Sequence, residues 1–258
     1  MQQIEIKSSD NEKIKTLRKL RSKKYRNKLG LFCVENWTII FDALKDGNQF
    51  ESIFVTEEFL KNNEDKMGFI FKNSNVDEYF VISEKVNESF SSLETAPGIC
   101  VVFRKTERPV ELNKKIIYLN AISDPGNLGT IFRSALAFGF ENIVLDENCV
   151  DAFSPKTIQA SKGSIFNLNI SFDKNFEILS DAKKMMKIIS TDVEKGKNLK
   201  DFSSKEIFCL VLGNETRGVD EEIKKMCDEF LNIKIDSRME SLNVAASASI
   251  IFYELGNS

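Results

Sequence analysis

Hydrophobic and polar residues follow two patterns that alternate along the chain. Short runs rich in β-branched and aromatic residues alternate with stretches in which apolar residues recur every three or four positions. The first pattern predicts strands and the second predicts helices. Residues 62–75 are polar and are predicted as a loop. In the first part of the chain, strands are predicted at 31–34, 52–55, 79–82 and 99–103, and helices at 37–44, 57–63 and 83–90.

The second part of the chain repeats this alternation with more strongly apolar strands. The run Ile207–Leu212 is apolar throughout, as in strands of a parallel sheet that is buried on both faces. The predicted fold class is therefore α/β with a mostly parallel sheet. Strands are expected at 115–121, 142–145, 167–171, 187–191, 206–212 and 231–235, and helices at 127–138, 155–162, 175–185, 219–227 and 243–255.

A charged stretch, Arg104–Asn113, separates the two parts. It contains Pro109 and has no hydrophobic period, as is typical of a linker between domains. The predicted organisation is a smaller α/β domain at 1–105, a linker at 106–113 and a larger domain at 114–258.

Composition narrows the classes of protein. Of the 258 residues, 42% are hydrophobic and 29% are charged, which excludes general disorder. No apolar run could cross a bilayer and no signal peptide precedes the first element, so a cytoplasmic protein is expected. Histidine is absent, which excludes Ser-His-Asp catalysis and histidine metal sites. The five cysteines lack a C-x-x-C pair, so no metal is predicted.

The distribution of charge suggests a polyanionic partner although the net charge is −3. Residues 13–28 carry many lysines and arginines and no acid. With the Ser9–Glu12 spacing of a capping box, they are predicted to form an amphipathic helix with a basic outer face. Such a face suits phosphate contacts, although a merely solvated helix is the alternative. The candidate RNA-binding residues are Lys19, Arg21, Lys23, Lys24 and Arg26.

Three loops at predicted strand ends carry the candidate chemistry. Ligands of parallel sheets bind beyond the carboxyl ends of the strands. The loops lie in 120–139 (NAISDPGNLGTIFRSALAFG), 210–219 (LVLGNETRGV) and 233–255. Each alone could be a capped helix or a bare turn. Their candidate residues are Asn127, Arg133, Glu215, Ser241 and Asn243.

Together the loops resemble the motifs of the SpoU (TrmH-like) branch of the SPOUT RNA methyltransferases. In addition, 154–166 resembles the family's segment between its first two motifs, and 8–44 resembles the L30e-like substrate-binding domain of its ribosomal-RNA members. The D-P-x-N-x-G-x-I-x-R-x-A motif matches at Asp124, Pro125, Asn127, Gly129, Ile131, Arg133 and Ala135; G-x-E-x-x-G matches at Gly213, Glu215 and Gly218; S-L-N-V matches at 241–244.

The resemblance implies S-adenosylmethionine (SAM) as the methyl donor, held in a deep trefoil knot, and a homodimer that shares its active site. It also implies transfer to a ribose 2′-hydroxyl of ribosomal RNA, most simply 23S. The cofactor contacts carried over are Gly213, Ile233 and Leu242, with Thr191 as a weaker candidate.

The same resemblance assigns the catalytic role to Arg133. We expect its guanidinium to anchor an RNA phosphate and to stabilise the developing alkoxide, because its pKa is too high for an ordinary base. A base role assisted by phosphate is the alternative. Asn127, Glu215, Ser241 and Asn243 would orient the arginine and the ribose.

The chain departs from the family pattern at two places. Ile233-Lys234-Ile235 replaces the family's Ile-Pro-Met, and Asn36 stands where glycine is common, so we expect an altered substrate fit.

Three alternative functions are considered. A transfer-RNA target is the nearest alternative, and a non-catalytic RNA-binding protein on the same fold is another. A dinucleotide oxidoreductase is disfavoured because the chain has no G-x-G-x-x-G.

Overall fold

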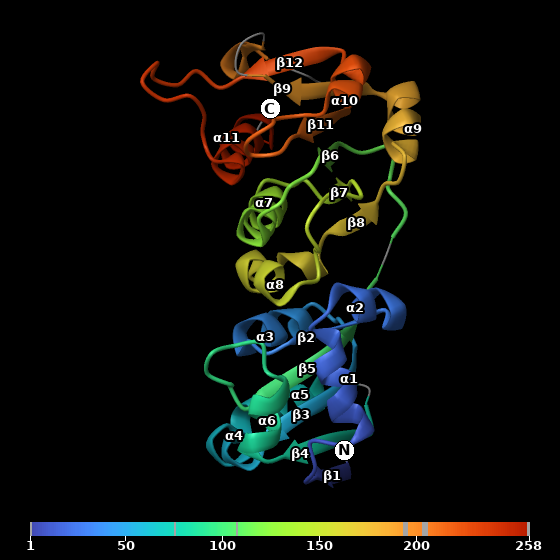
Figure 1. Cartoon of the computed structure of the whole chain (residues 1–258), viewed down its shortest axis with the longest axis vertical. Helices are drawn as coiled ribbons and strands as arrows, with labels where there is room; N and C mark the ends of the chain where they lie inside the picture. Colours follow the sequence, from blue (N-terminus) through green and yellow to red (C-terminus); the bar gives the residue numbers. More distant parts are fainter. Residues whose placement is uncertain (1, 75, 107, 193–195, 203–205, 257–258) are drawn as a thin grey trace. The chain divides into compact units, whose positions relative to one another are not determined.

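A computed structural model describes residues 2–74, 76–106, 108–192, 196–202 and 206–256. The chain folds into two compact units (Figure 1). Unit 1 comprises Met1–Thr106 together with Phe153–Phe166, and unit 2 comprises Glu107–Ala152 together with Asn167–Ser258. The chain therefore leaves unit 2 after Ala152 and returns to it at Asn167.

Unit 1 is built on a mixed sheet, five-stranded among the described residues, in the order β1-β4-β3-β5-β2. Neighbours β1, β4 and β3 are parallel, whereas β5 is antiparallel to both β3 and β2. The strands are β1 (Gln2–Ile6), β2 (Leu31–Val34), β3 (Phe50–Thr56), β4 (Glu78–Ile82) and β5 (Ile99–Arg104). The helices are α1 (Glu12–Leu20), α2 (Lys23–Leu29), α3 (Trp37–Lys45), α4 (Glu57–Asn62), α5 (Glu64–Lys72) and α6 (Glu84–Phe90).

Two elements of unit 1 differ from the sequence prediction. Strand β1 was not predicted, because it has only two apolar residues and becomes a strand by pairing with β4 at the sheet edge. Helix α5 lies where a loop was predicted, since only Met67 and Ile70 of this polar segment are buried. In both cases a tertiary contact outweighs a weak local pattern.

The basic segment 13–28 is also different: it forms two helices rather than one. Helix α1 is capped by Asn11, whose side chain accepts from the Lys13 amide, and not by Ser9. Ser22 has an extended backbone and precedes α2, so the helix is interrupted there.

Residues 153–166 complete the aromatic core of unit 1. This segment contains α8 (Pro155–Ser161) and a short 3₁₀ turn, Ser164–Phe166. The ring of Phe153 lies 5.0 Å from that of Phe32, measured between centroids. Phe166 lies 5.8 Å from Phe32 and 4.7 Å from Phe103. A segment that the sequence places in the second domain therefore packs on β2 and β5.

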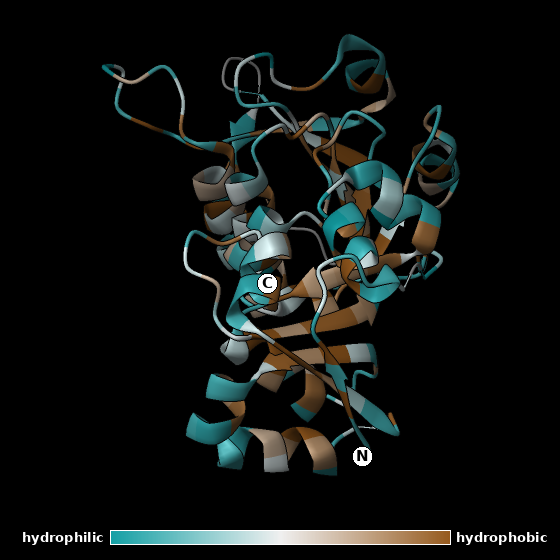
Figure 2. Cartoon of the chain, turned by 60° about the horizontal axis from the view of Figure 1, so that its bottom comes forward, coloured by the Kyte–Doolittle hydropathy of each residue, from teal (hydrophilic) through white to brown (hydrophobic). Residues whose placement is uncertain are grey.

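Unit 2 has an all-parallel sheet, as predicted, with seven strands among the residues described. Its order is β10-β12-β9-β11-β6-β7-β8. Figure 2 colours the chain by hydropathy, and most of its strands are brown, the colour of hydrophobic residues. The strands are β6 (Ile116–Leu119), β7 (Asn142–Leu145), β8 (Asn169–Phe172), β9 (Lys187–Thr191), β10 (Lys197–Asn198), β11 (Phe208–Leu212) and β12 (Glu229–Asn232). The helices are α7 (Pro125–Ala137), α9 (Glu177–Met185), α10 (Glu221–Met226) and α11 (Val244–Gly256), with a 3₁₀ turn at Leu199–Asp201.

Part of the predicted linker is attached to unit 2. The Ser171 hydroxyl donates to the Arg108 carbonyl at 2.7 Å, and the Asn169 amide donates to the Pro109 carbonyl at 3.0 Å. Residue 107 lies outside the described residues. The division into functional domains at 1–105 and 114–258 stays a prediction, as does the trefoil knot. Among the helices that the structure describes, none has the length and apolar character needed to cross a membrane.

Candidate active site

The first motif occupies the turn between β6 and α7. Asp124 ends the turn and accepts a hydrogen bond from the Asn127 amide at 2.8 Å, which caps the helix. Pro125 takes the first helical position, where its missing N–H costs nothing. Asn127 is thereby held in the first turn of α7.

The second motif is a tight loop directly after β11. Asn214 and Gly218 form a two-residue antiparallel bridge, and the Asn214 side chain accepts from the amides of Thr216 and Arg217. A Cβ atom on Gly213 would lie 2.3 Å from the carbonyl carbon of Gly218, so only glycine fits there. This local geometry orients the following carboxylate, Glu215.

A chain of hydrogen bonds joins all three predicted loops. The Glu215 carboxylate accepts from the Asn127 side chain at 2.8 Å and from the Ser123 hydroxyl at 3.1 Å. The Asn243 side chain donates to Asn127 Oδ1 at 2.9 Å. The side-chain oxygen of Asn243, Oδ1, accepts from the backbone amides of Ala245 and Ala246 at the start of α11. Three residues far apart in sequence therefore form one polar unit.

The same contacts set the protonation of Glu215. Partial burial acts to raise its pKa, but the hydrogen bonds from Asn127 and Ser123 outweigh burial and hold the pKa below its ordinary value. Glu215 is therefore ionised near neutral pH, and it accepts from Asn127 as a carboxylate.

A cavity of about 530 Å³ lies at the carboxyl ends of β9, β11 and β12. This volume lies within the range of small-molecule sites, roughly 300–1,000 Å³. Its lining includes the four predicted cofactor residues and two of the predicted catalytic ones: Thr191, Gly213, Ile233, Leu242, Glu215 and Ser241. Glu215 thus belongs both to the cavity wall and to the hydrogen-bonded unit.

Arg133 is placed differently from the other candidates. It is exposed on α7 and does not line this cavity. Within the described ranges its guanidinium has no ion pair or hydrogen bond. The single chain therefore brings together Asn127, Glu215 and Asn243, but leaves the predicted catalytic arginine facing outward.

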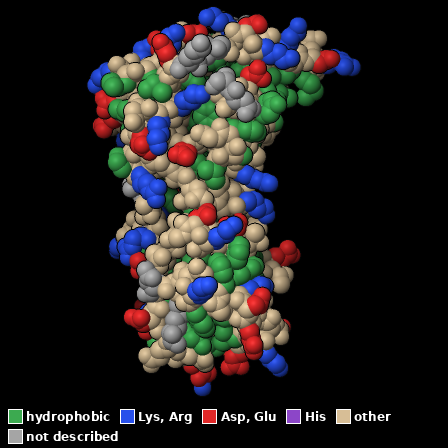
Figure 3. All heavy atoms as spheres, turned by 180° about the vertical axis from the view of Figure 1, so that it is seen from behind, with side chains coloured by type: hydrophobic (Ala, Val, Ile, Leu, Met, Phe, Trp, Pro, Cys, Tyr) green, Lys and Arg blue, Asp and Glu red, His purple; other side chains and the backbone are tan. Residues whose placement is uncertain are grey.

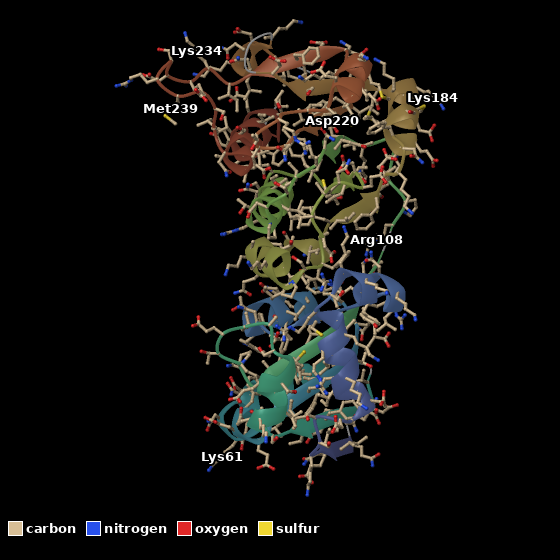
Figure 4. All side chains as sticks on the ribbon, viewed as in Figure 1. Lys61, Arg108, Lys184, Asp220, Lys234 and Met239 are labelled. Carbon is tan, nitrogen blue, oxygen red and sulfur yellow. The ribbon has the colours of Figure 1, made fainter. Side chains whose placement is uncertain are left out.

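Sequence reasoning missed a buried network behind the site. Asn120 is fully buried and donates to Asp146 at 2.7 Å and to Asp220 at 2.8 Å. Asp146 also accepts from the Ala121 amide. The network ties the first motif to the start of α10, where Figure 4 labels Asp220. A polar residue directly after an apolar strand was the available signal.

The basic residues of unit 1 divide into two groups. Lys19, Arg21, Lys23 and Lys24 are exposed on or beside α1 and α2. Arg26, by contrast, is only 4% exposed and donates to the Leu20 carbonyl at 2.7 Å. The prediction that Arg26 faces RNA is therefore wrong in this structure: its charge is used inside unit 1, at the turn between the two helices.

The fold and the site define a class of protein: an α/β protein with a ligand cavity at the carboxyl edge of a parallel sheet. The model of the SpoU rRNA Methylase family matches residues 114–253, and the model of the MRM3-like substrate binding domain matches residues 11–101. The chain belongs to the SpoU rRNA methylase family. The predictions of this family, of its fold class and of an RNA methyltransferase are thereby confirmed.

Individual relatives are similar in sequence or structure over almost the whole chain. The 23S rRNA (guanosine(2553)-2′-O)-methyltransferase RlmP of Bacillus subtilis is 31% identical over 97% of this chain and 98% of its own. The AdoMet-bound rRNA methyltransferase from Sinorhizobium meliloti has a TM-score of 0.84 at 24% identity, with 98% and 97% of the two chains covered. AviRb from Streptomyces viridochromogenes, in complex with AdoMet, has a TM-score of 0.82 at 20% identity, over 96% and 97%.

Proposed function

We propose that this protein is a SAM-dependent methyltransferase that modifies a ribose 2′-hydroxyl in ribosomal RNA. The observation that carries the proposal is the hydrogen-bonded unit of Asn127, Glu215 and Asn243 beside a cavity of cofactor size. The Sinorhizobium meliloti structure is AdoMet-bound, which supports SAM as the cofactor. The Bacillus subtilis relative is a 23S rRNA 2′-O-methyltransferase, which supports a ribose of ribosomal RNA as the acceptor.

The volume and the lining of the cavity are suited to SAM. Its wall combines apolar side chains, including Leu231, Ile233 and Leu242, with the turn that begins at Gly213. Ile233, Leu242 and Gly213 would hold the cofactor largely through their backbones, with Thr191 at the end of β9. When bound, SAM supplies an already activated methyl group.

The remaining residues position the acceptor. Because the donor is activated, catalysis consists mostly of alignment and stabilisation of the oxygen that attacks. The side-chain amide of Asn127 is fixed by its hydrogen bonds to Glu215 and Asn243. Ser241, two residues before Asn243, lines the cavity. Arg133 would bind an RNA phosphate and lower the energy of the developing alkoxide.

The function is tested by titrating SAM into the protein in a calorimeter and then measuring tritium transfer from labelled SAM to purified RNA. Binding of SAM with methylation of a 23S ribose supports the proposal. Methylation of transfer RNA alone would move the substrate to the alternative class. SAM binding with no transfer to any RNA would contradict a catalytic function.

We also propose that the protein forms a homodimer through α7 and α11. These helices pack on each other, and the Ser134 and Ser249 hydroxyls are 2.7 Å apart. On the outer side, Ile250 is 42% exposed and Tyr253 is 60% exposed. Exposed apolar side chains of this kind are typical of an interface. Figure 3 shows the opposite side of the molecule from Figure 1, where hydrophobic side chains also reach the surface in several places. Arg133 is exposed on α7, one of the two helices of the proposed interface.

The dimer predicts the effect of a charge on this face. Ile250→Glu is expected to convert the dimer to monomer, because a carboxylate would have to be desolvated at the interface. Light scattering after size-exclusion chromatography measures the mass. The exposed Met185, which lies on α9, provides a control: Met185→Glu should leave the dimer intact. A monomeric wild-type protein would contradict the proposal.

The exposed basic residues of α1 and α2 predict that the affinity for RNA depends on the salt concentration. Changing Lys19 and Lys24 together to glutamine should weaken binding and reduce the slope of log affinity against log salt by roughly one per lost phosphate contact. Fluorescence anisotropy with a labelled 23S fragment measures both. Lys61→Gln on α4, labelled in Figure 4, is the charge control within unit 1. An unchanged slope in the double variant would contradict RNA contact by α1 and α2.

The trefoil knot and the L30e-like character of unit 1 belong to the same proposal, through membership of the family. The proposal includes a cytoplasmic location, which a ribosomal-RNA substrate supports.

A further inference from the structure

The second motif contains a charged residue to which the proposed function gives no role. The family pattern G-x-E-x-x-G leaves three positions open, and the last two of them are Thr216 and Arg217 in this chain. Arg217 lines the 530 Å³ cavity and is exposed. Its guanidinium has no hydrogen bond or ion pair in the part of the chain that the structure describes.

The backbone that carries Arg217 is held firmly. Its amide donates to Asn214 Oδ1 at 3.1 Å, and the next residue, Gly218, donates to the Asn214 carbonyl at 2.9 Å. Gly218 has a φ of 70°, a conformation that glycine adopts without strain. The guanidinium is therefore attached to a fixed point on the cavity wall, and only its side chain has to be ordered by a ligand.

The other cation of the cavity wall and two of its three carboxylates are already engaged, whereas Glu240 has no partner among the described residues. Lys224 donates to Glu221 at 2.7 Å. Glu215 accepts from Asn127 and Ser123, and Asp192 interacts within the chain. Arg217 is thus the cation on this wall whose donors remain available to an anion, within the described residues.

The chemistry of SAM supplies a matching anion. Its methionine part ends in a carboxylate, which a short aliphatic chain joins to the methyl-bearing sulfonium. For transfer to the proposed acceptor, the methyl group of bound SAM would face the side on which Glu215 contacts Asn127. Arg217 is two residues from Glu215 on the same loop and lines the same cavity. We propose that Arg217 binds the SAM carboxylate through paired N–H donors, the geometry that guanidinium groups favour. This inference rests on the proposed function.

Calorimetry with two compounds related to the cofactor tests this role without turnover. S-adenosylhomocysteine has the carboxylate, whereas 5′-methylthioadenosine lacks the amino-acid part. Arg217→Gln should raise the Kd of S-adenosylhomocysteine about tenfold or more and leave that of 5′-methylthioadenosine unchanged. Arg217→Lys keeps the charge but not the paired donors, so its Kd for S-adenosylhomocysteine should lie between those of the wild type and Arg217→Gln. Lys225→Gln, an exposed cation on α10 outside the cavity lining, should change neither Kd.

The outcomes separate this inference from the function on which it rests. Equal weakening of both ligands would mean that Arg217 shapes the pocket and would overturn a carboxylate contact. An unchanged Kd for S-adenosylhomocysteine together with weaker RNA binding would assign Arg217 to a phosphate instead, and would also overturn it. If the wild-type protein bound neither ligand, the proposed function would itself be wrong.

Discussion

Replacing Arg133 with alanine is expected to lower methyl transfer about 10²–10³-fold, the loss typical of removing one group that stabilises a developing oxyanion. The protein should remain folded, because Arg133 is exposed and has no partner within the described residues that its removal would disturb. SAM affinity should also be unchanged, since Arg133 does not line the cavity. Single-turnover transfer of tritium from labelled SAM measures the rate of the chemical step.

Arg133→Lys distinguishes the two roles considered for this residue. A lysine keeps a positive charge for the phosphate and the alkoxide, so an electrostatic role predicts partial activity with no new dependence on pH near neutrality. A base role predicts activity that rises with pH as the lysine loses its proton. Full turnover by Arg133→Ala, with SAM and RNA still bound, would remove Arg133 from the mechanism.

Phe153→Ala is expected to destabilise unit 1 by about 3–5 kcal/mol, the usual cost of truncating a buried phenylalanine. Phe153 is 4% exposed and packs on Phe32. The only tryptophan, Trp37, belongs to unit 1, so its fluorescence during urea unfolding reports this unit. The transition should move to lower urea with little change in slope.

Phe71→Ala is the matched control for that experiment. Phe71 lies in the same unit but is 40% exposed, so its truncation should cost about 1 kcal/mol or less. If Phe153→Ala left the Trp37 transition where it is, residues 153–166 would not be part of the core of unit 1.

Much of the architecture follows from local patterns. Strand β11 and helix α11 agree with their predictions within two residues, because an apolar run and a stretch of helical period are strong signals over their length. Strand β10 was missed, and so were β1 and α5, which have two buried apolar residues or fewer from which to recognise them. The structure of β1 and α5 depends on β4 and on the core, which no local window contains.

The candidate site divides in the same way. Asn127, Glu215 and Asn243 were identified from motifs at strand ends, and their mutual hydrogen bonds agree with one shared site. Arg26 shows the opposite case. Its residue type and charged neighbours favour RNA contact, but the turn at Ser22 directs its side chain to the Leu20 carbonyl inside unit 1.

The amino-acid sequence by itself determined the α/β class, the parallel sheet and the residues of three polar loops, because these depend on side-chain periodicity and on glycine, proline and capping residues close together in the chain. Only the tertiary structure decided that residues 153–166 complete the core of unit 1, that Arg26 is buried and that Arg217 lines the cavity. The burial of Arg26 involves a hydrogen bond across the turn at Ser22, and the other two features depend on contacts between segments distant in sequence, whose energies no local pattern of residues contains.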